Sequence, residues 1–253
     1  MSRVKKSGLD ACDFDVILNA EHENHDHDMK YLYGSQQAHI HGAARSPEPR
    51  HDTSEYHHED QAHDHRNCDH SSNNQEHNHH THGHRNLSDI MDILEQAQLT
   101  DRARATAKKI FTILGEAEAK AHGTTLEEVH FHEVGAVDSI VDIVSAAVCL
   151  DSLDVQEIIV PVRYERCRTP RCQHGVLPVP GPAVSNIAAA QHLKLHITGL
   201  PGEFVTPTGA AIVAAVRTSD TLPEEFTIER IGLGAGKRSY EGASGLLRAM
   251  LIS

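Results

Sequence analysis

The residues best suited to chemistry lie in one short stretch, HFHEVGAVDSIVDIV, residues 130–144. His130 and His132 are separated by one phenylalanine, and the carboxylate of Glu133 follows directly. If the backbone before Glu133 is extended, both imidazoles point to the same side, because side chains alternate along a strand. Neutral imidazole is a common ligand of nickel and zinc, so these residues form a candidate site for one such metal ion.

The residues that follow also fit an ordinary helix start. Ser139, with Asp142 three residues later, matches a capping box, and Asp138 adds negative charge at the positive end of the helix. This interpretation leaves His130 and His132 unexplained, although H-x-H is a common string. Both interpretations stay open at this point.

A second concentration of metal-binding residues fills residues 22–84, which hold 16 of the 22 histidines. Polar and acidic residues separate them, so almost nothing can be buried, and we expect residues 21–85 to form a disordered tract. Such a tract offers many weak, exchangeable sites to metals that bind imidazole, among them Zn, Cu, Ni and Fe. Its densest clusters supply the candidate ligands His63, His65, His79, His80, His82 and His84.

Composition excludes several classes of protein. The chain has 253 residues and a formal net charge of −13, which argues against a nucleic-acid binder, since such proteins present a basic face. No apolar run approaches the roughly 20 residues that a membrane span needs, and no signal peptide is apparent. Five scattered cysteines do not make a disulfide framework. We therefore expect a cytoplasmic protein that handles cations.

The hydrophobic patterns predict an α/β (α+β) fold, with helices packed on a mixed sheet and interrupted by the histidine-rich tract. We expect residues 86–253 to form one folded domain. Residues 1–20 would be a remnant of an N-terminal strand region, because alternating apolar residues over 14–18 suggest a strand with no earlier strand to pair with. Within the folded domain we expect helices over 85–99, 100–123 and 139–153, helices opening at Pro182 and Pro207, a strand over 157–162, and two C-terminal strands around a Gly-rich turn.

A candidate anion site opens the helix that begins in TPTGAAI, residues 206–212. Thr206 occupies an N-cap position, and Thr208 and Gly209 lie in the first turn, where free N–H groups, hydroxyls and the helix dipole favour negative charge. A well-capped core helix is the equally simple alternative. Lys237 and Arg238 sit in the C-terminal turn GLGAGKR, which is not a P-loop because its spacing differs and no Ser or Thr follows the lysine.

Cys167, Cys172 and His174 could also bind a metal ion. A loop with two unpaired thiols explains them as well, because no second pair completes a four-ligand site.

Several long motifs occur in register and resemble the LarC family, the nickel-insertion proteins of nickel-pincer cofactor synthesis. They are EAEAKAHGTTLEEVHFHEVGAVDSIVDIVSAAVCLD, HGVLPVPGPA, TPTGAAI and GLGAGKR, preceded by the histidine-rich tract. The resemblance is close over residues 86–253. It implies a nickel chelatase or lyase that binds Ni(II) and inserts it into pyridinium-3,5-bisthiocarboxylic acid mononucleotide, using CTP and Mn(II) or Mg(II). The recipient of the finished cofactor is a lactate racemase-type apoenzyme.

Within that chemistry, His130 and His132 would hold nickel, and Glu133 and Asp138 are the candidate catalytic carboxylates. Thr206, Thr208 and Gly209 would bind the substrate phosphate, joined by Lys237 or Arg238.

The sequence departs from the family pattern in three places. It lacks the N-terminal SGISGDM-like segment and the C-terminal CTP-handling domain, and RYERCRTPRC replaces a Gly-containing stretch. We therefore expect an incomplete nickel-binding half, to which a separate chain could supply the C-terminal domain. The sequence leaves a homo-oligomer open.

Two other functions remain as alternatives. The first is a nickel or zinc store or metallochaperone without catalysis. The second is a metal-dependent hydrolase built on His130, His132 and Asp138, which would cleave a generic ester without any pincer precursor.

Overall fold

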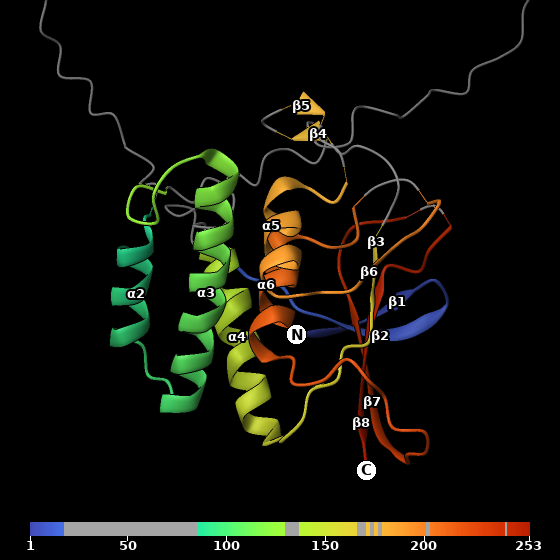
Figure 1. The fold of residues 1–253 in the computed structure, drawn as a ribbon. Helices are drawn as coiled ribbons and strands as arrows, with labels where there is room; N and C mark the ends of the chain where they lie inside the picture. The colour runs from blue at the N-terminus through green and yellow to red at the C-terminus, as the bar shows by residue number, and fades with distance from the viewer. Residues whose placement is uncertain are drawn as a thin grey trace, which may run out of the picture. The chain divides into compact units, whose positions relative to one another are not determined.

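The computed structural model describes residues 1–17, 85–129, 137–165, 171–172, 175–176, 179–200, 203–240 and 242–253. All of them belong to one compact unit, made of residues 1–35 and 84–253. Its helices and strands form an α+β fold with a mixed sheet, which confirms the predicted fold class (Figure 1).

The first two described helices have well-defined ends. Helix α2 (Leu87–Gln96) begins at Asn86, whose side chain accepts a hydrogen bond from Asp89 N at 2.9 Å, while the Asp89 carboxylate accepts one from Asn86 N at 3.0 Å. Helix α3 (Asp101–His122) begins after Thr100. It ends at Gly123, where the φ of +67° suits glycine. Both ends of α3 are where the sequence predicts them.

Three further helices complete the helical part. They are α4 (Val137–Leu153), α5 (Pro182–Ala190) and α6 (Pro207–Val216). Pro182 and Pro207 occupy the first turns of α5 and α6, as predicted, because a proline there loses no intrahelical hydrogen bond. The predicted capping role of Ser139 is wrong: α4 begins two residues earlier, so Ser139 lies inside its first turn.

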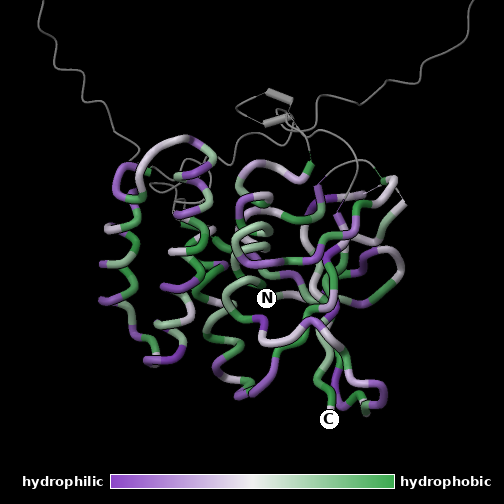
Figure 2. The backbone as a smooth tube through the Cα atoms, in the orientation of Figure 1, coloured by the Kyte–Doolittle hydropathy of each residue, from purple (hydrophilic) through white to green (hydrophobic). Residues whose placement is uncertain are grey.

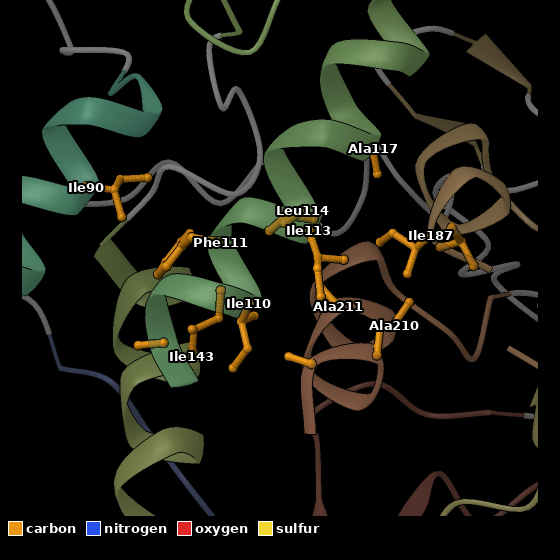
Figure 3. Close-up of a cluster of buried hydrophobic side chains, with 14 of the residues drawn as sticks. Ile90, Ile110, Phe111, Ile113, Leu114, Ala117, Ile143, Ile187, Ala210 and Ala211 are labelled. Carbon is orange, nitrogen blue, oxygen red and sulfur yellow. The ribbon is translucent and has the colours of Figure 1, made fainter. Parts of the chain in front are cut away.

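The hydrophobic core lies between these helices. Ile110, Phe111 and Leu114 of α3 are all fully buried. Figure 3 shows Ile113 of α3 close to Ala211 of α6, and small alanines here let the two helices approach closely. Figure 2 shows that α2 has one hydrophobic side and that this side faces α3.

The main sheet has four strands in the order β1-β2-β7-β8. Strands β1 (Ser2–Lys6) and β2 (Leu9–Asp13) form an antiparallel hairpin, and β2 pairs in parallel with β7 (Ile228–Ala235). Strand β8 (Leu246–Ile252) pairs antiparallel with β7, so the two predicted C-terminal strands are confirmed.

The predicted N-terminal strand is misplaced. Residues 14–17 are not in a strand, and the strand that joins the sheet ends at Asp13, with β1 before it as its partner. The sequence predicts a strand at 14–18 because apolar residues alternate clearly there. Strands β1 and β2 contain several charged and few apolar residues, so their own alternation is too weak to predict them.

Two small sheets complete the described elements. Strand β3 (Arg163–Glu165) pairs in parallel with β6 (Leu195–Ile197), and β4 (Arg171–Cys172) pairs antiparallel with β5 (Gly175–Val176). The predicted strand over 157–162 is wrong, since that stretch contributes only an isolated bridge between Ile159 and Ser219. In the described part of the chain no helix is both long and apolar enough to cross a membrane.

Candidate functional site

Most of the predicted metal ligands fall outside the described residues. His130, His132 and Glu133 do, as do His63, His65, His79, His80, His82 and His84 of the tract. Asp138 lies in the first turn of α4. Among the described residues, no three His, Cys, Asp or Glu side chains are close enough together to hold a metal ion. The proposed nickel ligands therefore remain predictions from the sequence.

The predicted anion site is the mouth of α6, by which we mean Glu203 to Gly209. Thr206 is the N-cap, as predicted, and its Oγ1 accepts a hydrogen bond from Gly209 N at 3.2 Å. A Cβ on Gly209 would lie 3.3 Å from that oxygen, which is a tight contact, so glycine leaves room for the capping hydroxyl. Residues 206–209 are all half-buried, so the mouth is within reach of a ligand.

The cap limits what the mouth can donate to an anion. Pro207 has no N–H, and the N–H of Gly209 already binds Thr206. The remaining donors of the first turn are the N–H of Thr208 and the two threonine hydroxyls. These are few for a doubly charged phosphate, so a cation nearby would strengthen the site.

The structure brings one of the two predicted cations to this mouth. Arg238 Nη1 lies 3.6 Å from the carboxylate of Glu203, three residues before the N-cap. Beside this pair, the rings of Phe204 and Tyr240 meet edge to face with centroids 5.0 Å apart. Thus the two residues at 203–204, just before the TPTGAAI motif, contact the last residue of the GLGAGKR motif and Tyr240 beyond it.

Lys237 is directed elsewhere. Its ammonium group is 2.5 Å from the carboxylate of Asp15, in an exposed ion pair. The hydrogen bond to Asp15 raises the pKa of Lys237 above its ordinary value. The adjacent turn is held by Lys6, which donates to the carbonyl oxygens of Gly236 and Arg238, the latter at 2.6 Å.

The structure adds a residue that the sequence analysis missed. Glu165, at the end of β3, is completely buried, and its two carboxylate oxygens accept hydrogen bonds from Phe204 N at 2.8 Å and Val205 N at 3.1 Å. It therefore holds the backbone just before the N-cap of α6. A buried acidic residue between Tyr164 and Arg166 has no distinctive sequence pattern, so only its burial reveals it.

Comparison with known proteins agrees with the motif resemblance. A sequence model of the family described as nickel insertion protein matches residues 1–253. This chain belongs to the nickel insertion protein family.

Its relatives carry names that specify the chemistry. A protein of Alkaliphilus metalliredigens named pyridinium-3,5-bisthiocarboxylic acid mononucleotide nickel insertion protein is 44% identical over 100% of this chain and 50% of its own length. A protein of the same name from Akkermansia muciniphila is 44% identical over 67% of this chain and 41% of its own length. The chain therefore spans about half the length of the relatives it matches. No solved structure matches it.

Proposed function

We propose that this chain binds Ni(II) as its cargo and delivers it to pyridinium-3,5-bisthiocarboxylic acid mononucleotide. The product is the nickel-pincer cofactor of lactate racemase-type enzymes. The observation that carries the proposal is the family match over residues 1–253, together with relatives whose names state both the metal and the mononucleotide.

The metal side of the proposal rests on the histidine-rich sequence. Many weak sites in residues 22–84 gather nickel, and His130 and His132 hold one ion in place. Nickel–carbon bond formation breaks a C–H bond of the pyridinium ring, between the two thiocarboxylates, and the proton passes to a nearby base. Glu133 is our candidate for that base, with Asp138 as a second carboxylate.

The substrate side of the proposal uses the mouth of α6. The phosphate of the mononucleotide would accept hydrogen bonds from the N–H of Thr208 and the hydroxyls of Thr206 and Thr208, at the positive end of the helix. Arg238 stands beside this mouth and can exchange its Glu203 partner for the phosphate. Lys237, held by Asp15, contributes charge at longer range.

The full reaction in this proposal is a CTP-dependent nickel insertion. CTP, with Mn(II) or Mg(II), would act through a C-terminal domain outside these 253 residues. A lactate racemase-type apoenzyme would receive the product.

The test is nickel transfer in solution. The chain is loaded with Ni(II) and mixed with the mononucleotide, CTP and Mn(II), with and without the remaining half of a full-length relative supplied as a separate polypeptide. We expect the nickel-pincer product, detected by mass spectrometry, when both halves are present. Absence of product in every mixture, with a full-length relative active as the control, would refute the proposal.

A second candidate function is nickel storage without catalysis. The 16 histidines of residues 22–84 favour it, because storage needs many exchangeable ligands and no substrate site. Under this alternative the chain takes up several nickel ions but does not bind the mononucleotide. Equilibrium binding of the mononucleotide to the chain therefore separates the two functions.

A further inference from the structure

We propose that Glu165 is a positioning residue for substrate binding, which fixes the backbone leading into α6 and thereby the groups that hold the phosphate of the mononucleotide. The inference rests on the proposed function of the mouth of α6. It adds a residue from a different strand, 41 positions before the N-cap, to a site otherwise built from two motifs.

Both carboxylate oxygens of Glu165 accept hydrogen bonds from the backbone just before α6. One carboxylate oxygen accepts from Phe204 N and the other from Val205 N, and Thr206 follows as the N-cap. Phe204 and Val205 precede the helix, so no intrahelical acceptor exists for their N–H groups. Glu165 satisfies both groups with a single rigid carboxylate.

Glu165 can act as a fixed anchor because backbone hydrogen bonds join its strand to the segment that contains β6. Arg163 N donates to Lys194 O at 3.1 Å, and Thr198 N donates to Glu165 O at 2.7 Å, so β3 is tied to β6 and to the residue after it. Hydrogen bonds from backbone N–H groups to a charged carboxylate are stronger than those between neutral groups. Glu165 therefore fixes the position of residues 204 and 205 relative to β3.

The anchored residues connect directly to the substrate-binding groups. Glu203, next to Phe204, pairs with Arg238, and the ring of Phe204 contacts Tyr240. On the other side, Val205 is buried and leads to Thr206. A shift of residues 204 and 205 would therefore change the position of the helix mouth relative to Arg238. Such a change would weaken the binding of a phosphate that is held by both.

A purely structural role is the alternative, since a buried carboxylate must have partners in any protein. The two roles differ in what a substitution changes. Substitution of a purely structural residue lowers only the stability of the unit. Substitution of a positioning residue also lowers the substrate affinity of the molecules that remain folded.

The test compares Glu165→Gln with a control of similar structural cost. In E165Q the amide oxygen still accepts one N–H, but the amide nitrogen faces the other N–H as a second donor. The control is Asn186→Ala, which removes a hydrogen bond from Asn186 Nδ2 to Ala117 O of 3.0 Å, between α5 and α3. Binding of the mononucleotide to the full chain is measured by titration calorimetry at a temperature where circular dichroism shows all variants folded.

We expect E165Q to raise the dissociation constant of the mononucleotide about tenfold or more, while N186A leaves it unchanged at a comparable loss in Tm. Equal affinity of E165Q and N186A overturns the inference. Should E165Q not fold, Glu165→Asp is used with the same criterion, because it keeps the charge and shortens the reach by one methylene group.

A further pair of variants separates this inference from the proposed function. Thr206→Ala and Thr208→Ala remove the hydroxyls that would contact the phosphate itself. If they leave the affinity unchanged, the phosphate does not bind at the mouth and the proposed substrate site fails. If they weaken binding while E165Q does not, the site stands and only the role of Glu165 fails.

Discussion

Arg163 carries a buried charge that the described residues do not neutralise. The residue is only 9% exposed, and none of its three guanidinium nitrogens has a hydrogen-bond partner among the residues that the structure describes. Burial, and then the charge of Arg217, lower the pKa of Arg163. An unpaired buried guanidinium costs free energy, because the ion loses its hydration without a compensating partner.

Replacing Arg163 by methionine should therefore stabilise the unit, by about 1–2 kcal/mol, since an apolar side chain of similar length removes the unpaired charge. Arg102→Met is the control, because Arg102 donates to Asp154 Oδ1 at 2.8 Å and to Val155 O at 2.9 Å and its loss should lower the stability. Urea denaturation followed by circular dichroism measures both. A lower stability of R163M would show that Arg163 has a partner.

The two adjacent cations of the Gly-rich turn should differ in their effect on substrate. Arg238→Ala removes the charge beside the mouth of α6, and we expect it to weaken mononucleotide binding about tenfold. Lys237→Ala breaks an exposed pair with Asp15 and should change the affinity by less than about twofold, because exposed charges are screened by salt. Calorimetric titration of both variants checks this. The reverse order would assign the phosphate to Lys237.

At the scale of elements, the sequence predicted helices better than strands, for a physical reason. Helix ends carry local signals, as Thr100 and Gly123 show for α3, and Pro207 for α6. The short strands β1 and β3 take their places from pairing with distant segments, and their own apolar pattern is weak. For the same reason Thr206 was predictable at the candidate site, whereas Glu165 was not.

The N-cap of α3 offers a test of how much one local signal contributes. Thr100 Oγ1 accepts from Ala103 N at 3.1 Å and donates to Asp151 of α4 at 2.7 Å, so it both starts α3 and ties it to α4. Thr100→Ala should lower the free energy of unfolding by about 1–2 kcal/mol. Thr112→Ala is the control within the same helix. Its hydroxyl only bonds the Lys108 carbonyl one turn back, and alanine favours the helix, so we expect no loss. Equal losses in thermal melts would contradict the capping role.

At the scale of the whole molecule, stability comes from the helical part. Every described member of the core cluster lies between Ile90 and Ala215, on or beside the five helices. The four-stranded sheet adds little, since Ile231 is 59% exposed and Leu247 76% exposed. The histidine-rich tract has few large apolar residues to contribute to such a core.

Deleting residues 22–84 should therefore leave the helices and the melting temperature unchanged while it reduces the number of nickel ions bound. Circular dichroism and nickel titration measure the two effects. Loss of helix in the deletion would contradict the assignment of the core.

In the undeleted chain, nickel loading should fall steeply between about pH 7 and pH 5, because protons compete for imidazoles with a reference pKa of about 6.5. Nickel loading that persists at pH 5 would indicate oxygen ligands.

The same deletion of residues 22–84 removes the nickel sites of the tract, so that the proposed nickel site at His130 and His132 can be tested separately. In that background His130→Ala with His132→Ala should abolish the remaining tight nickel binding, because two of its proposed ligands are lost. The stability should change little, since side chains that face a ligand contribute few core contacts, unlike the neighbouring Val129, which is buried in the core. If the two histidines instead make buried hydrogen bonds, the double variant should lose about 1–3 kcal/mol for each unsatisfied group and keep its nickel affinity. Melting temperature and nickel affinity, measured on the same preparation, distinguish the two results, and Val129→Ala serves as the control that lowers the stability without removing a ligand.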